Sequence, residues 1–467
     1  MKELRRNMRF VGTLVVILFV GLAAWFAMTV FTQGSVWASD VRNSRLRATA
    51  SLRGDITDRD GNLLATTAED GTRQYTKNTT ARRALSQTGG DTAGMSTGIE
   101  TFYSATLLDI STGLLGRLNE LFSSAKHVGG SIQITVDGPL QAYIASEFPA
   151  GYRGAVCVIN YKTGEILAMV SMPNYDPYDL AVRSDTQVED TAYLNRCLQG
   201  LYTPGSVFKI ITLASAITND VNVLDQAFSC SGTWEYEGGH IVCAGNTAHG
   251  TVNLKTAFKR SCNVTFGKLA YQLGLERLRQ TAERFGFNEN FKFGDFVVYN
   301  SAFPTDVGNM NGLVWAGIGQ GEVLVTPLHM AMITGTVANG GVMMKPWLIQ
   351  RIRSSVGKTT ATGAPAAYRQ VLSESVASKI AEYMYETVQS GTATRAAIKG
   401  YTVGGKTGSA EVSNDKTVET NAWFTGFIYD EAHPYAISVV IEGGGAGARM
   451  PSELAAKALK KAIEFVG

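Results

Sequence analysis

The chain has 467 residues, which is too long for one ordinary domain, and its formal net charge is only +2. Because basic and acidic residues are interspersed, the charge gives no reason to expect a nucleic acid partner. The five cysteines show no paired pattern, which argues against a scaffold held together by disulfides.

A predicted membrane-spanning helix lies near the amino terminus. Residues 1–9 carry four basic side chains, and residues 10–31 carry no charge. At about 1.5 Å per residue, the uncharged stretch spans roughly the 30 Å of a bilayer's hydrocarbon. The flanking charges predict a cytoplasmic tail, a single pass through the plasma membrane and an external remainder. A cleaved signal peptide is the alternative, but its apolar core is usually shorter, at about 7 to 15 residues.

Residues 32–128 have a polar composition and are predicted to form a small separate domain. Residues 76–98 are especially rich in Ser, Thr and Gly. Such a stretch is a loop or a mobile surface unless it packs against something.

From residue 129 to residue 467 the apolar pattern predicts one larger domain. The expected elements are a strand at 131–136, a helix at 139–148, a hairpin of 154–160 with 165–171, a helix at 327–337, a hairpin of 422–429 with 435–442, and an amphipathic helix at 451–466. Between the hairpins most of the chain has a helical pattern. Together these elements predict a fold of the α/β class (α+β type), with helices flanking an antiparallel sheet.

Ser206 and Lys209 are the first candidates for chemistry. Pro204-Gly205 forces a turn and Ser206 can cap the segment after it, so we expect a helix to begin there. The serine and the lysine then lie on one helical face, where the amine can remove the hydroxyl proton as the oxygen attacks. Because Ser-x-x-Lys arises by chance in most long chains, this pair alone is weak support.

Two further segments strengthen the prediction. Ser261-Cys262-Asn263 lies between the helical patterns of 254–260 and 264–273, and Lys406-Thr407-Gly408 lies in a glycine-rich strand at 403–410. Ser-x-x-Lys, Ser-x-Asn and Lys-Thr-Gly, in this order, form the signature of penicillin-binding proteins and serine β-lactamases.

Over most of its length the chain resembles a class B penicillin-binding protein, a monofunctional peptidoglycan DD-transpeptidase. Outside the three motifs, similar segments lie at 53–61, 163–169, 319–321 and 326–328. The resemblance implies a penicillin-binding transpeptidase domain at 129–467 on a non-catalytic pedestal at 32–128. It also suggests an inter-domain salt-bridge role for Arg53, Asp58 and Arg59, for which a solvated turn is the alternative.

The resemblance implies a role for each of five catalytic residues. Ser206 attacks the D-Ala-D-Ala end of a peptidoglycan stem peptide, and Lys209 acts as its base. Ser261 relays a proton, Asn263 binds the amide backbone of the substrate, and Lys406 holds its carboxylate. A free lysine has a pKa of about 10.4, so burial or a neighbouring cation must lower the pKa of Lys209. Lys406 is the candidate cation, and a solvated edge-strand charge is its alternative role.

The substrate-binding residues implied by the resemblance are Thr407, Gly408 and Ser409. The two hydroxyls help to bind the substrate carboxylate, and the glycine lets the strand approach the substrate closely. The backbone amides of Ser206 and Ser409 are the implied donors to the oxyanion. Most members compared with this chain have Thr where Ser409 stands, and the hydroxyl is retained.

No cofactor is predicted. The implied partners are peptidoglycan stem peptides, β-lactams that acylate Ser206 as covalent inhibitors, and a polytopic membrane glycosyltransferase, because the chain shows no glycan polymerase region of its own. A β-lactamase or a DD-carboxypeptidase, which passes the same acyl group to water, is one alternative. A non-catalytic β-lactam receptor or scaffold is another.

Cys230, His240, Cys243 and His249 are close enough in sequence to raise the question of a zinc site. Their spacing fits no standard zinc finger, and a Cys230–Cys243 disulfide or free thiols are the alternatives. Free thiols are favoured, so no metal site is predicted. Cys262, inside the second motif, is expected only to pack.

Overall fold

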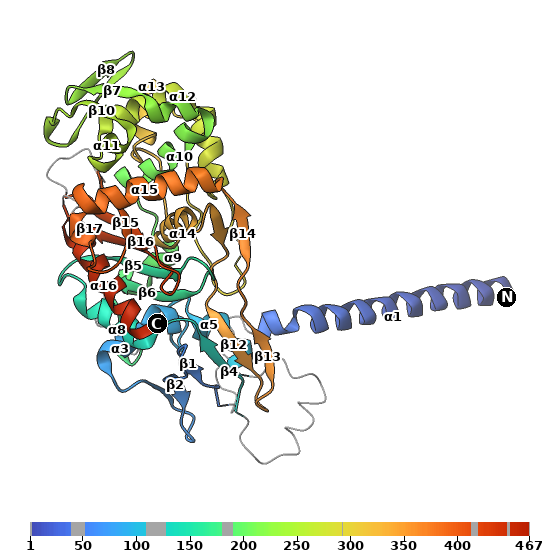
Figure 1. The fold of residues 1–467 in the computed structure, drawn as a ribbon. Helices are drawn as coiled ribbons and strands as arrows, with labels where there is room; N and C mark the ends of the chain where they lie inside the picture. Colours follow the sequence, from blue (N-terminus) through green and yellow to red (C-terminus); the bar gives the residue numbers. More distant parts are fainter. Residues whose placement is uncertain are drawn as a thin grey trace.

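An antiparallel sheet of five strands organises the carboxy-terminal part of the chain (Figure 1). In spatial order its strands are β15 (Val403–Ala410), β16 (Asn421–Ile428), β17 (Tyr435–Glu442), β5 (Arg153–Asn160) and β6 (Ile166–Met172). Both predicted hairpins and the predicted glycine-rich strand are confirmed. The structure, a computed structural model, describes residues 2–38, 52–108, 128–179, 190–291, 293–411, 419–445 and 449–466.

Both faces of this sheet are buried. Successive residues of a strand point to opposite faces, and in β5 Val156 and Val158 belong to one apolar cluster while Ala155 and Cys157 belong to the other. A strand buried on both faces must be apolar almost throughout, which explains the apolar runs in the sequence. Helices α8 (Gly138–Glu147) and α16 (Met450–Val466) cover the first face, and α14 (Pro327–Ala338) packs on the second.

The predicted helices at 139–148, 327–337 and 451–466 are confirmed within one or two residues. All residues of α14 are buried, as expected for a helix that is apolar all round. The other helices after α8 are α9 (Arg196–Gln199), α10 (Lys209–Asn219), α11 (Leu254–Lys259), α12 (Asn263–Arg284), α13 (Met310–Ala316) and α15 (Glu374–Ser390).

Between the hairpins the chain is less helical than its pattern predicts. Short strands occupy much of this region: β7 (Ala227–Cys230), β8 (Thr233–Tyr236), β9 (Gly239–Val242), β10 (Gly250–Asn253), β11 (Val342–Met344), β12 (Ile349–Arg353), β13 (Thr359–Thr362) and β14 (Ala367–Gln370). Strands β7 to β10 form two two-stranded sheets in a lobe at the end of the molecule opposite β1 and β2 (Figure 1).

A second sheet of six strands joins segments from both sides of residue 128. Its order is β13-β12-β4-β1-β2-β3, where β1 is Ile56–Thr57, β2 is Leu63–Thr67, β3 is Arg73–Tyr75 and β4 is Ser131–Ile134. Strand β4 contains most of the strand predicted at 131–136, and it pairs with β1 in parallel and with β12 in antiparallel register. The domain boundary placed at residue 128 stays a prediction.

Most of residues 76–98, expected as a loop unless packed, are buried or half-buried. They contain α3 (Thr79–Ala84) and α4 (Ser86–Gly89), and α5 (Ile99–Phe102) and α6 (Ser104–Leu107) follow. The buried side-chain amide of Gln87 donates to the carbonyl oxygens of Ser171, Pro173 and Ala192 at 3.3, 3.0 and 2.8 Å. Because these bonds satisfy polar groups, a polar sequence can be buried here.

The three residues given a possible salt-bridge role behave differently from one another. Arg53 pairs with Glu100 at 2.9 Å, on the same side of residue 128. The buried carboxylate of Asp58 accepts from the backbone amide of Asn62 at 2.8 Å and from that of Gly138 at 3.4 Å. Arg59 has a buried guanidinium nitrogen without a hydrogen-bond partner among the described residues. Asp58 is thus linked to the segment after residue 128 by a hydrogen bond from the backbone amide of Gly138, and not by a salt bridge.

Helix α1 (Lys2–Ala38) extends away from the rest of the molecule (Figure 1). Its segment Arg6–Phe26 is long and apolar enough to cross a membrane, and none of that segment is buried. The single pass and its direction stay predictions.

Candidate active site

Ser206 lies in a 3₁₀ turn, Gly205–Phe208, that runs directly into α10. Gly205 has φ +56°, a left-handed value that glycine adopts readily. A Cβ on Gly205 would lie 2.4 Å from the carbonyl oxygen of Ser409, so only glycine lets the turn lie against β15. The predicted capping role of Ser206 is wrong, because Pro204 occupies the cap position of the turn and no side chain caps it. The hydroxyl of Ser206 therefore makes no capping hydrogen bond to a backbone amide of the turn.

The amine of Lys209 lies among four oxygen atoms. Its Nζ is 3.1 Å from Ser206 Oγ, 2.8 Å from Ser261 O, 3.2 Å from Ser261 Oγ and 2.7 Å from Asn263 Oδ1. A neutral amine has two hydrogens and one lone pair, whereas the charged form only donates. With the hydrogens directed at the two nearest oxygens, of Ser261 and Asn263, the lone pair can accept the proton of Ser206.

The Ser261-Cys262-Asn263 turn connects α11 to α12. Ser261 has φ +56°, and the N-cap of α12 is Cys262, whose Sγ accepts from the amide of Thr265 at 3.4 Å. A capping role for Ser261 or Asn263 is therefore excluded, and their side chains are available to the site. Asn263 also donates from Nδ2 to the carbonyl oxygen of Val242 at 2.8 Å, which fixes the amide orientation.

Lys406, on β15, also contacts the hydroxyl of Ser261. Its Nζ donates to Ser261 Oγ at 2.9 Å and to Thr407 O at 3.0 Å. Its side chain is fully buried, so it is not a solvated edge-strand charge. The three motifs thus converge on one point, where the Ser261 hydroxyl lies between two lysine amines.

Burial controls the electrostatics of both amines. It lowers the pKa of Lys209 to about 8. It also lowers the pKa of Lys406 well below its ordinary value, and the nearby charge of Lys209 lowers it further. The aromatic rings of Phe266 and Phe258 lie 5.6 and 5.7 Å from Lys209 Nζ and Lys406 Nζ. Because neither amine has a carboxylate partner among the described residues to offset the loss of hydration, each becomes neutral at a lower pH than a free lysine does.

Thr407, Gly408 and Ser409 continue β15 past Lys406. The hydroxyls of Thr407 and Thr392 lie 2.7 Å apart, whereas Ser409 is exposed. A Cβ on Gly408 would lie 2.9 Å from Pro204 O and 3.1 Å from Val207 Cγ1. The glycine was predicted to let a substrate approach, but the close approach that it permits here is that of the Ser206 turn.

Comparisons with known proteins show which family the chain belongs to. Residues 154–464, about two thirds of the chain, match the family described as "Penicillin binding protein transpeptidase domain". The chain belongs to the penicillin-binding protein transpeptidase family. As the sequence motifs predicted, it is a class B member of the family.

Relatives of this penicillin-binding protein carry more specific names. It is 31% identical over 468 residues to "Peptidoglycan D,D-transpeptidase PbpA" of Mycolicibacterium smegmatis, covering 94% of each chain. It is 27% identical to the crystal structure of PBPA from Mycobacterium tuberculosis, with a TM-score of 0.81, covering 89% of this chain and 100% of that one. The penicillin G acyl-enzyme complex of the M. tuberculosis protein matches with a TM-score of 0.79 at 27% identity, covering 89% and 99%.

Sequence reasoning missed several residues that position the site of this penicillin-binding protein. Gln320 Nε2 donates to Ser409 O at 3.4 Å, and Gly319 O accepts from the amide of Gly205 at 2.8 Å. The sequence indicates only that their segment is similar to the family. Thr392 and the Val242 carbonyl carry no sequence signal, because a lone threonine and a backbone oxygen are common to every chain.

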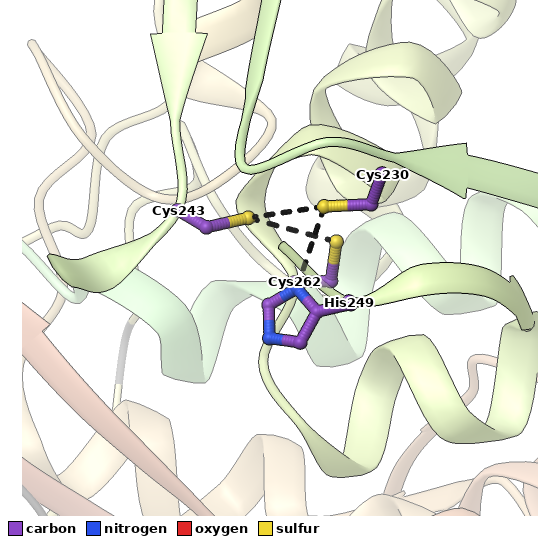
Figure 2. A group of neighbouring side chains, drawn as sticks. All are labelled: Cys230, Cys243, His249 and Cys262. Carbon is purple, nitrogen blue, oxygen red and sulfur yellow. Dashed lines mark hydrogen bonds between the residues drawn. The ribbon is translucent and has the colours of Figure 1, made fainter. Parts of the chain in front are cut away.

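The cysteines of this penicillin-binding protein are free thiols, the alternative that the sequence favoured. Sγ of Cys230 and Sγ of Cys243 lie 3.6 Å apart as free thiols, too far for a disulfide of about 2.05 Å. His240, which was considered as a ligand, is exposed on β9. Cys262, which was expected only to pack, lies beside Cys243 (Figure 2).

Proposed function

We propose that the protein is a peptidoglycan D,D-transpeptidase that cross-links stem peptides through an acyl-enzyme on Ser206. The observation that carries the proposal is the 3.1 Å contact between Ser206 Oγ and Lys209 Nζ, with Ser261 Oγ bridging to Lys406. The names of its relatives, which are D,D-transpeptidases, and an acyl-enzyme complex with penicillin G among the related structures give further support.

In the first half-reaction, neutral Lys209 takes the proton of Ser206 as the oxygen attacks the penultimate D-Ala carbonyl. The peptide bond to the terminal D-Ala then breaks, and the leaving amine receives a proton through Ser261. The products are free D-Ala and an ester on Ser206. In the second half-reaction, the amine of a neighbouring stem peptide attacks that ester, loses its proton by the same route and returns Ser206 to its hydroxyl form.

Binding of the substrate is proposed to use the edge of β15. The hydroxyls of Thr407 and Ser409, together with the charge of Lys406 when it is protonated, bind the terminal carboxylate. The backbone amides of Ser206 and Ser409 donate to the oxyanion, and the close packing of Gly205 against Ser409 supports this pairing. Asn263 binds the substrate backbone.

The setting of the enzyme is part of the proposal. Helix α1 is proposed to anchor it by one pass in the plasma membrane with the catalytic residues outside, and the apolar segment Arg6–Phe26 supports this. A polytopic membrane glycosyltransferase is proposed as the partner that supplies glycan strands. β-Lactams are proposed to acylate Ser206 as substrate analogues.

The decisive experiment is intact-mass measurement after incubation with benzylpenicillin, followed by mapping of the modified peptide. We expect one adduct, on Ser206, and an adduct on any other residue would overturn the assignment. Incubation with a stem peptide donor and an amine acceptor then separates the alternatives. A cross-linked dimer supports the transpeptidase, while free acid as the sole product, or rapid repeated hydrolysis of penicillin, would contradict it.

A further inference from the structure

Three thiols and one imidazole lie close together next to the active site, where Cys262 separates Ser261 from Asn263 in the chain. The Sγ atoms of Cys230, Cys243 and Cys262 and a ring nitrogen of His249 all lie within 4.8 Å of one another (Figure 2). The three cysteines are buried, and His249 is half-buried. Three thiolates and one imidazole are the donor set of a common structural zinc site.

The separations of these atoms suit a single tetrahedral ion. Zinc binds sulfur at about 2.3 Å and nitrogen at about 2.0 to 2.1 Å, which places two sulfurs roughly 3.8 Å apart and a sulfur and a nitrogen roughly 3.6 Å apart. Three of the six distances are close to these values: 3.6 Å from Cys230 to Cys243, 3.7 Å from Cys243 to Cys262, and 3.4 Å from Cys230 Sγ to His249 Nδ1; all six are within 4.8 Å. Since Cys243 is nearly equidistant from two thiols, the arrangement favours neither as a disulfide partner.

Each of the four possible zinc ligands lies at the end of a different strand or helix. Cys230 ends β7, Cys243 follows β9, His249 precedes β10, and Cys262 caps α12. The amide of Cys243 donates to Gly232 O at 2.8 Å, which holds the two loops together.

Cys262 has the environment of a thiolate ligand. Its Sγ accepts two hydrogen bonds from Thr265, from the backbone amide at 3.4 Å and from Oγ1 at 3.2 Å. Donors of this kind orient a metal-bound sulfur.

We propose that Cys230, Cys243, His249 and Cys262 bind one Zn²⁺, which fixes the lobe of β7 to β10 to the start of α12. On binding, the three thiols release their protons and the neutral imidazole coordinates through Nδ1. No oxidation takes place.

Such a cross-link would stabilise the lobe, which adds only a few buried side chains, among them Phe228, Ile241 and Val252, to the main apolar cluster. Each of its strands has four residues, and they form only two-stranded sheets, which are marginally stable alone. In β8 none of the residues is fully buried, and in β10 only Val252 is. A metal ion supplies the stability that so small a core lacks.

The same ion braces the active site. Cys262 lies between Ser261 and Asn263, and Asn263 Nδ2 bonds to Val242 O, one residue before the ligand Cys243. Loss of zinc is therefore expected to displace Ser261 and Asn263, two of the three residues that contact the Lys209 amine. This second step rests on the proposed function, whereas the metal site itself does not.

The test starts with the full-length chain, purified in detergent with a reducing agent and without chelator. Elemental analysis is expected to find about one zinc per chain, and Co²⁺ added to metal-free protein is expected to give the absorption bands of thiolate-bound tetrahedral cobalt. Cys230→Ser and His249→Gln each remove a direct ligand, so they should lower zinc affinity by more than the roughly 10-fold to 100-fold that loss of an outer-shell partner costs. The matched controls Cys197→Ser and His240→Gln, a buried thiol and an exposed histidine outside the cluster, should retain the metal.

Wild-type protein that contains no metal and takes up neither Zn²⁺ nor Co²⁺ would overturn the proposal, even if the variants fail to fold. A disulfide between two of the three cysteines in metal-free protein isolated without reductant, and no zinc uptake after reduction, would overturn it as well. For the second step, chelation should slow acylation by benzylpenicillin at least about tenfold, and added Zn²⁺ should restore it. Unchanged acylation of metal-free protein would refute the bracing role, whereas zinc-loaded protein that is never acylated would refute the proposed function alone.

Discussion

The two sides of the Ser261-Cys262-Asn263 turn form two different clusters. Ser261 and Asn263 contact the amine of Lys209, while Cys262, between them, faces sulfur. The amine side is held by long elements: the eight-residue β15 and the eleven-residue α10. On the sulfur side, Cys230, Cys243 and His249 adjoin strands of four residues, and only Cys262 is attached to a long element, α12. The amine side is thus positioned by long elements of the main fold, whereas the proposed zinc ion would hold the short elements of the sulfur side in place.

The largest expected difference between the two sides appears when the proposed nucleophile, Ser206, is removed from the amine side. Ser206→Ala is expected to abolish the benzylpenicillin adduct completely, although all five cysteines remain, because buried thiols are poor nucleophiles. Intact-mass measurement checks this, with the exposed Ser390→Ala as a control that keeps the adduct. An adduct on Cys262 in the alanine variant would show that the sulfur side is reactive.

The next largest effect is expected from the base. Lys209→Met keeps most of the side-chain volume but cannot accept a proton, and acylation should slow by about 10² to 10⁴-fold. Stopped-flow or quench measurements with benzylpenicillin give the rate. Lys162→Met, in the exposed turn between β5 and β6, should acylate normally. An equal loss in both variants would point to instability and away from catalysis.

The dependence on pH sharpens the role of the same amine. Because burial lowers the pKa of Lys209 to about 8, the neutral base is fully present above that pH and is lost below it. The acylation rate should therefore fall about tenfold per pH unit below 8 and level off above it. Unfolding temperatures measured over the same range serve as the control. A rate that does not change between about pH 6 and pH 9 would exclude Lys209 as the base with that pKa.

The smallest expected effect concerns the support of β15. Thr392→Val removes the hydroxyl 2.7 Å from that of Thr407 and should lower the free energy of unfolding by about 0.5 to 1.5 kcal/mol. Denaturant unfolding measures the change, and Thr362→Val, exposed on β13, should have little effect. If both substitutions lower the free energy of unfolding by the same amount, the contact between the hydroxyls of Thr392 and Thr407 does not stabilise the fold.

The residues on the amine side could be found in the sequence because three motifs, Ser-x-x-Lys, Ser-x-Asn and Lys-Thr-Gly, occur there in a fixed order. Ser206, Lys209, Ser261, Asn263 and Lys406 all lie where the motif interpretation requires. Their roles stay predictions, since geometry alone does not test them.

The sulfur side was harder to predict because its donors are brought together by loops, and spacing along the chain does not reveal this. His240 and His249 are equally plausible in the sequence, yet pairing of β8 with β9 leaves His240 exposed, whereas His249 enters the cluster before β10. Cys262 gave no signal of its own because its neighbours already explain the motif. The packing of residues 76–98 was missed for a similar reason, since Gln87 finds its partners more than 80 residues away in sequence.

The six-stranded sheet limits where the chain can be shortened, because its strands come from both sides of residue 128. The family match starts at residue 154, but β12 hydrogen-bonds to β4 at 131–134, and β4 to β1 at 56–57. A fragment cut at the start of the match would leave β12 with a bare edge, which is a template for aggregation. A fragment should instead begin ahead of β1, so that α1 is removed and the sheet keeps all its strands.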